Sequence, residues 1–228
     1  MSPRRTVPQK KQNELPRWVI PIGVGVVIVI FVILLNALQS PAAAVSTTPS
    51  LTGSSKTIGN PNSKIAFVVF ADFQCPICRQ FAVTSGQQIE DQYVKTNKIS
   101  FTYKYYPVVD HGAIGESHWS AEAAECANQQ GKFWEYHDKL IAVWVGENVG
   151  TFSKANLKQY AVQIGLDPAQ FNPCIDNDQT YAVVQADETQ AGTLGLPGTP
   201  SFLINGQYYN PQSLDFSEFS HTFDSLLK

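Results

Sequence analysis

The chain has 228 residues and a mass of 25.1 kDa, with 43% hydrophobic and 15% charged side chains, proportions that suit a packed core and exclude collagen-like, coiled-coil and mucin-like chains. Of its 16 basic and 19 acidic side chains, five basic ones and one acidic one precede residue 41, so residues 41–228 carry a formal charge of −7. This acidic balance excludes nucleic-acid binding by that part of the chain.

A long uncharged, apolar segment occupies residues 18–38, after a basic tail over residues 1–17. The segment is long enough to cross the roughly 30 Å of hydrocarbon in a bilayer. Because the five nearby cations all precede it, the positive-inside rule predicts a transmembrane helix with a cytoplasmic N-terminus. The rest of the chain would then work outside the cytoplasm, held at the cell membrane. A cleaved signal peptide is the alternative, since residues 42–44 are small alanines.

The segment that follows, residues 39–55, is rich in Ser, Thr, Pro and Ala and predicts a flexible linker. The folded domain is expected over residues 56–228. Residues 65–71 form a nearly continuous apolar run, typical of a central strand, and residues 99–105 alternate apolar and polar side chains as a second strand would. Between them, residues 76–93 have helical periodicity. Strand, helix and strand indicate an α/β sheet.

The second half of the chain begins with helical periodicity, from residue 117 to about residue 190. We therefore expect a helical insertion over about residues 112–192. After it, residues 201–209 predict a β-hairpin, because Asn205-Gly206 is a tight-turn pair between two apolar runs. Residues 216–226 then predict a closing amphipathic helix.

Cys75 and Cys78, separated by Pro76 and Ile77, directly follow the first predicted strand. Pro76 suits the first position of a helix, which leaves Cys75 at the N-cap with its sulfur facing unpaired N–H groups. Those groups and the helix dipole favour the thiolate, so the pKa of Cys75 is expected to fall below the ~8.5 of a free cysteine. Cys75 is the predicted nucleophile. Cys78, one turn later and more buried, would resolve mixed disulfides.

Two other interpretations of this cysteine pair stay open. Two cysteines at this spacing can bind zinc, although zinc pairs usually occur twice and Cys126 and Cys174 are isolated in the sequence. A purely structural disulfide is the other, although it would close a very short loop and so constrain little chain entropy.

A proline heads the predicted strand that starts at Ser201. Because proline cannot donate a hydrogen bond to a sheet, Pro200 indicates a special turn there, which a cis Thr199–Pro200 peptide bond would provide. Taken alone, an ordinary loop proline is the alternative.

Three segments of the chain together resemble the DsbA-like branch of the thioredoxin superfamily, over residues 56–228: residues 70–78, 131–138 and 195–206. The resemblance implies a thioredoxin fold with a helical insertion, and thiol–disulfide exchange on protein substrates. By position, Cys75 corresponds to the exposed attacking cysteine and Cys78 to its buried partner. Thr199 and the cis-proline Pro200 correspond to the edge that pairs with the substrate backbone.

The chain departs from that family at two places. The strong oxidants of the family have histidine as the second residue between the cysteines, where this chain has Ile77. Many superfamily members also have a buried acid in the first strand, where this chain is apolar, and Asp72 at the end of the strand is the nearest carboxylate. Asp72 is predicted either to assist proton transfer or to cap a turn.

Cys126 and Cys174 both lie on predicted apolar helix faces. In an exported protein such a pair favours a structural disulfide. Two buried free thiols and a redox relay are the alternatives.

The resemblance implies an enzyme that oxidises cysteine pairs in unfolded or partly folded exported proteins, without a cofactor or metal. A quinone-linked membrane partner would re-oxidise the reduced pair. Two alternatives remain: a reductase or isomerase that runs the same chemistry in the other direction, and a non-enzymatic, membrane-tethered peptide-binding module.

Overall fold

The computed structural model describes residues 55–111 and 114–228, which belong to one compact unit, Pro49–Lys228. The predicted basic tail and transmembrane helix, and all but the last residue of the predicted linker, lie outside the described residues. Among the helices that are described, none has the length and apolar character needed to span a membrane.

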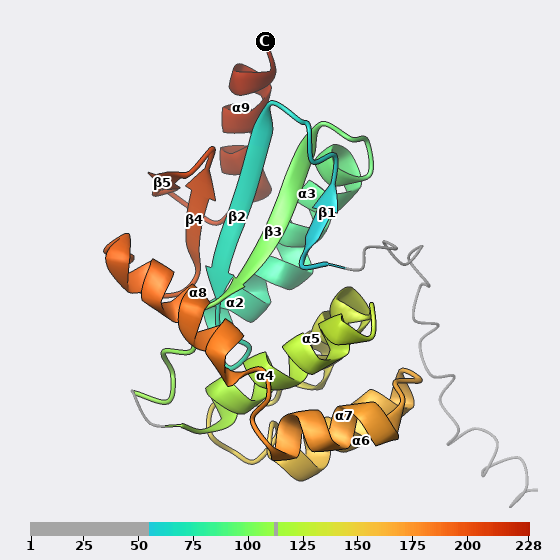
Figure 1. Ribbon diagram of the computed structural model, residues 1–228. Coiled ribbons are helices and arrows are strands. Elements are labelled where there is room, and N and C mark those ends of the chain that lie inside the picture. The colour runs from blue at the N-terminus through green and yellow to red at the C-terminus, as the bar shows by residue number, and fades with distance from the viewer. Residues whose placement is uncertain (1–54, 112–113) are drawn as a thin grey trace, which may run out of the picture. The chain divides into compact units, whose positions relative to one another are not determined.

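A mixed sheet forms the centre of the molecule (Figure 1). Its strands lie in the order β1-β3-β2-β4-β5, in which β2 and β3 are parallel and the other pairs antiparallel. Their bounds are β1 (Thr57–Gly59), β2 (Ile65–Ala71), β3 (Ile99–Tyr105), β4 (Ser201–Ile204) and β5 (Gln207–Tyr209). Four of these strands coincide with the predicted ones, whereas β1 was not predicted.

The crossover between the parallel strands β2 and β3 is helical throughout, as the periodicity predicts. It consists of α2 (Pro76–Phe81), a π-helical segment (Ala82–Gly86), α3 (Gln87–Ile89) and a second π-helical segment (Glu90–Val94). With α9 (Phe216–Leu227), it covers one face of the sheet. Burial of aromatic rings holds this face together: the ring of Phe67 on β2 lies 5.2 Å from that of Phe223 and 5.7 Å from that of Phe202. Each such ring contributes about 1.5–3 kcal/mol by leaving water.

A helical layer extends from one end of the sheet (Figure 1). It contains α4 (Glu116–Gln129), α5 (Phe133–Val143), α6 (Lys154–Gln163) and α7 (Pro168–Asp176), and α8 (Tyr181–Thr193) leads from it back to the sheet. Gly131 and Gly165 follow two of these helices with φ of 71° and 73°, a conformation that glycine adopts without strain. On α8, Ala191 packs with Phe70 and Leu203 on the second face of the sheet.

A disulfide between Cys126 and Cys174 joins α4 to α7. Both residues are buried. The bond links positions 48 residues apart, and the loss of chain entropy in the unfolded state gives it a stabilising contribution of about 4 kcal/mol.

Candidate active site

The cysteine pair lies where β2 gives way to α2. Cys75 is the N-cap of α2 and Pro76 occupies its first turn. The backbone N–H of Cys78 donates to the Cys75 sulfur at 3.4 Å, so the sulfur takes the place of an ordinary capping oxygen. Both cysteines are free thiols in this structure.

The expectation that Cys75 is the exposed member of the pair is wrong. Cys75 is 6% exposed and Cys78 is 4% exposed, so both residues are buried, Cys78 the more deeply. The reason is that the Cys75 side chain turns back over the helix end and lies beside Thr199, whose carbonyl accepts its S–H at 3.5 Å. Ile77, between the two cysteines, is instead exposed to solvent, at 46%.

Electrostatics distinguish the two sulfurs. A hydrogen bond from the Cys78 side chain lowers the pKa of Cys75 most, and hydrogen bonds from Thr199 and from backbone N–H groups of α2 add to this, so that the pKa is about 6 despite burial. Burial raises the pKa of Cys78, and the neighbouring Cys75 sulfur raises it further. The first proton therefore leaves Cys75, which makes Cys75 the thiolate at neutral pH.

The Thr199–Pro200 peptide bond is cis. Ser201, the first residue of β4, anchors this turn because its hydroxyl donates to the Gly198 carbonyl at 2.6 Å. The turn brings Thr199 to the Cys75 sulfur across 124 residues of sequence. The structure thus places the two motifs that the sequence analysis singled out against each other.

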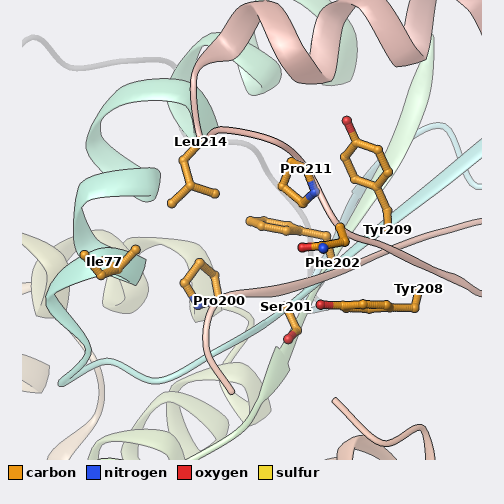
Figure 2. A pocket seen from close by; sticks show the side chains of 9 residues that line it. Ile77, Pro200, Ser201, Phe202, Tyr208, Tyr209, Pro211 and Leu214 are labelled. Atoms are coloured by element: carbon orange, nitrogen blue, oxygen red, sulfur yellow. The ribbon is translucent and has the colours of Figure 1, made fainter. Parts of the chain in front are cut away.

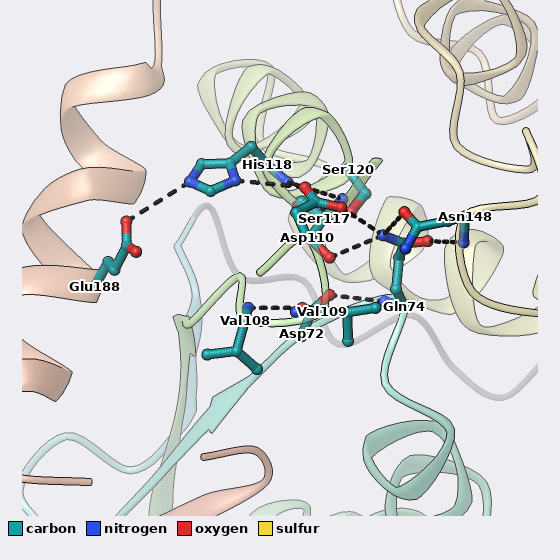
Figure 3. A network of polar contacts seen from close by, with 10 residues as sticks. All are labelled: Asp72, Gln74, Val108, Val109, Asp110, Ser117, His118, Ser120, Asn148 and Glu188. Carbon is teal, nitrogen blue, oxygen red and sulfur yellow. Dashed lines mark hydrogen bonds and ion pairs between the residues drawn. The ribbon is translucent and has the colours of Figure 1, made fainter. Parts of the chain in front are cut away.

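Asp72 lies at the start of the turn that leads to Cys75 and is 3% exposed. Its carboxylate accepts the backbone N–H of Gln74 at 2.8 Å and those of Val108 and Val109 at 2.9 Å (Figure 3). Burial raises the pKa of Asp72, although these hydrogen bonds act against the rise. These contacts are those of a turn cap that joins two loops. A role in proton transfer stays a prediction.

A cavity of about 220 Å³ adjoins the cis-proline (Figure 2). Ile77 from α2, Pro200 from the cis turn and Leu214 from the segment before α9 surround it, and the β4–β5 hairpin forms its floor. Tyr208 on that hairpin is 47% exposed. The site therefore continues from the reactive pair into a mainly apolar hollow.

The sequence analysis missed Gln74, which is fully buried directly before Cys75. Its side chain lies at the centre of a polar network that reaches into the helical layer (Figure 3). A single glutamine carries no motif, and its partners are distant in the sequence, so only the folded chain shows the network.

Cys126 and Cys174 do not belong to this site, since they cross-link two helices of the helical layer. Across residues 55–111 and 114–228, no group of three or more His, Cys, Asp or Glu side chains is arranged to hold a metal ion. The chemistry that these residues can perform is exchange at sulfur.

Comparison with known proteins agrees with this geometry. A family model described as thioredoxin matches residues 51–225. The chain is 25% identical over 233 residues to probable disulfide bond formation protein D of Bacillus anthracis, covering 96% of this chain and 99% of that protein. It is 27% identical over 158 residues to Na⁺/H⁺ antiporter NhaA 3 of Salinispora tropica, where the match covers 69% of this chain but only 22% of the antiporter.

Among solved structures, oxidised BdbD from Bacillus subtilis is similar to this chain with a TM-score of 0.68 and 19% identity, over 78% of this chain and 97% of that one. This similarity confirms the predicted DsbA-like thioredoxin fold.

Proposed function

This chain belongs to the thioredoxin family, and on that premise we propose that it is a thiol–disulfide oxidoreductase whose reactive pair is Cys75 and Cys78. One observation carries the proposal. A sulfur with a lowered pKa caps a helix, its partner with a raised pKa lies one turn further on, and a cis-proline turn contacts the first sulfur. The relative described as a probable disulfide bond formation protein supports the same activity.

The proposed direction is oxidation of the substrate. In the oxidised enzyme, a substrate thiolate attacks the Cys75 sulfur, the Cys75–Cys78 bond breaks, and Cys78 leaves and takes up a proton. A second substrate thiolate then attacks the substrate sulfur of the mixed disulfide, and Cys75 leaves as a stable thiolate. Two electrons pass to the enzyme. Because the lowered pKa stabilises the reduced form, it makes the Cys75–Cys78 disulfide more oxidising than a pair with an ordinary pKa would be.

Unfolded or partly folded protein chains are the proposed substrates. The cis turn offers backbone groups of Thr199 beside the reactive sulfur, which suits an extended peptide bound by strand addition. The apolar hollow next to Pro200 would accept a neighbouring side chain of that peptide. Both features suit recognition of an extended segment rather than of a folded surface.

The proposed place of work is outside the cytoplasm at the cell membrane, with residues 18–38 as the anchor. The basic residues before that apolar segment support this orientation. A quinone-linked membrane partner would then re-oxidise the pair, and anchoring both proteins in one bilayer would raise their effective concentration.

The test is oxidation of reduced, unfolded ribonuclease by the oxidised full chain, together with the equilibrium constant of the Cys75–Cys78 pair against glutathione. We expect regain of ribonuclease activity, and none with Cys75→Ser. A reduction potential near −270 mV, the thioredoxin range, would replace the oxidase with a reductase. A Cys75–Cys78 disulfide that exchanges with neither glutathione nor substrate would leave only a peptide-binding module.

A further inference from the structure

Gln74 directly precedes the reactive cysteine, and its side chain is 0% exposed. A buried amide destabilises the folded state for each hydrogen bond that it leaves unmade. The neighbours of Gln74 along the chain, Phe73 and Cys75, cannot satisfy it, so the amide has to be paired with other segments.

The Gln74 amide is paired on both of its polar atoms. The two hydrogens of Nε2 are shared among three acceptors: Asp110 Oδ1 at 2.9 Å, Ser117 Oγ at 2.9 Å and Asn148 Oδ1 at 3.1 Å (Figure 3). Oε1 accepts the backbone N–H of Asn148 at 2.6 Å. The backbone of Gln74 is held as well, because its N–H donates to Asp72 and its carbonyl accepts the indole N–H of Trp144 at 2.8 Å.

These partners come from three separate segments: the loop after β3, the first turn of α4, and the loop between α5 and α6. The segments are themselves tied together. Asp110 caps α4 by accepting the backbone N–H groups of Ser117 at 2.9 Å and His118 at 3.2 Å. Glu116 holds the loop after α5, since its carboxylate accepts the N–H groups of Gly150 and Phe152. The segments that bind Gln74 are thus themselves held by hydrogen bonds.

The reactive sulfur depends on where this turn is held. The Cys75 thiolate is stabilised by hydrogen bonds from the Cys78 side chain and from the Cys78 backbone N–H, which lies 3.4 Å from the sulfur. Cys75 is one peptide unit from Gln74, and its own N–H donates to the Asp72 carbonyl at 3.1 Å. A shift of the Gln74 backbone would therefore move the sulfur out of these contacts.

We infer that Gln74 is a positioning residue: its buried amide fastens the reactive turn to the helical layer and so holds the Cys75 sulfur at the N-terminus of α2, where the thiolate is stabilised. The inference rests on the proposed function, since it concerns the same sulfur. It gives the helical layer a part in the reactivity of the pair, beyond covering one end of the sheet.

The test substitutes Gln74→Leu in the full chain, which removes the amide at similar volume. The control is Gln80→Leu, the same change at an exposed position of α2, the helix that follows the reactive turn. We measure the pH dependence of Cys75 alkylation and the equilibrium constant for reduction of the Cys75–Cys78 disulfide by glutathione. For Gln74→Leu, we expect the pKa of Cys75 to rise by one unit or more and the equilibrium constant to fall about tenfold. Gln80→Leu should behave as wild type.

A purely structural role would lower the melting temperature of Gln74→Leu and leave both readouts of the folded protein unchanged, which would overturn the inference. If Gln74→Leu does not fold, Ser117→Ala and Trp144→Phe decide, because each removes one partner of Gln74. We expect the equilibrium constant to fall about twofold in each variant. An unchanged equilibrium constant in both variants would also overturn the inference. An ordinary pKa for Cys75 in the wild-type chain would instead remove the proposed function itself.

Discussion

The two cysteine pairs of this chain lie in opposite surroundings. Cys75 and Cys78 share one helix N-terminus, where N–H groups face a sulfur, and both are free thiols. Cys126 and Cys174 lie in the last turns of α4 and α7, 48 residues apart, and form a disulfide. Burial does not distinguish the pairs, because all four residues are buried. The comparison teaches that reactivity at sulfur follows from local hydrogen bonding and backbone position rather than from exposure.

Removing one sulfur from the active-site pair gives the largest expected effect. Cys75→Ser should reduce disulfide exchange at least a thousandfold, because the hydroxyl cannot form the mixed disulfide. Cys78→Ser should instead accumulate mixed disulfides, since the resolving thiol is missing. Stopped-flow exchange with a cysteine-containing peptide and mass spectrometry measure the two outcomes. Disulfide exchange that persists in Cys75→Ser would mean that another cysteine is the nucleophile.

The second pair should respond in stability and not in chemistry. The double variant Cys126→Ala, Cys174→Ala should lose about 4 kcal/mol of unfolding free energy, because the unfolded chain regains the entropy of the closed loop. Peptide exchange, measured at a temperature where the variant is folded, should stay within about twofold of wild type. Urea unfolding measures the change in unfolding free energy. Loss of disulfide exchange in a folded variant would indicate that the Cys126–Cys174 disulfide acts as a redox relay.

The active-site pair should make the reduced protein more stable as pH rises. The pKa of Cys75 in the folded state, about 6, lies below its ordinary value of 9.0. The stabilisation is therefore complete above the unfolded pKa and is lost as pH falls through 6. Between pH 9 and pH 5, the reduced form should lose on the order of 3 kcal/mol relative to the oxidised form. Urea unfolding of both forms across this range measures it, with reduced Cys75→Ser as the matched control.

The helical layer contains a group with the opposite pH dependence. Glu122, one turn before Cys126 on α4, is 1% exposed, and neither carboxylate oxygen has a hydrogen-bond partner among the described residues. Burial raises the pKa of Glu122 to about 7, helped by the charge of Asp178 and opposed by that of Lys154. The folded state thus prefers the neutral acid, and its stability contribution, present below the unfolded pKa, is lost as pH rises through 7.

Glu122→Gln should therefore be more stable than wild type above pH 7, by about 2 kcal/mol at pH 8.5, and similar to it at pH 5. Thermal unfolding at the two pH values tests this expectation, and Glu147→Gln, at an exposed position, is the control. Equal stabilisation at both pH values would mean that ionisation of Glu122 is not the cause.

The sequence predicted those parts of the fold and site that depend on residues close together in the chain. The apolar run of β2, the Asn205-Gly206 turn and the capping position of Cys75 each depend on neighbouring residues, and each appears where it was predicted. Strand β1 was missed because three residues ending in glycine give too short a pattern. The π-helical segments were missed because apolar spacing over five residues does not distinguish them from an α-helix.

The burial of Cys75 and the pairing of Gln74 could not be predicted for a different reason. Thr199 covers the Cys75 sulfur from a position 124 residues away, and the Gln74 amide meets groups 36, 43 and 74 residues away. Such contacts exist only in the folded chain. Contacts distant in sequence set the environment of a motif, whereas the motif itself is local.

The Thr199 carbonyl has a consequence for turnover. In the dithiol state this oxygen accepts the Cys75 S–H, whereas a sulfur joined to a substrate has no hydrogen to donate. A peptide amide and the thiol hydrogen therefore compete for this acceptor only while Cys75 is protonated, which is below its pKa of about 6. Linkage then requires a peptide that pairs with this carbonyl to leave more readily below about pH 6 than above it.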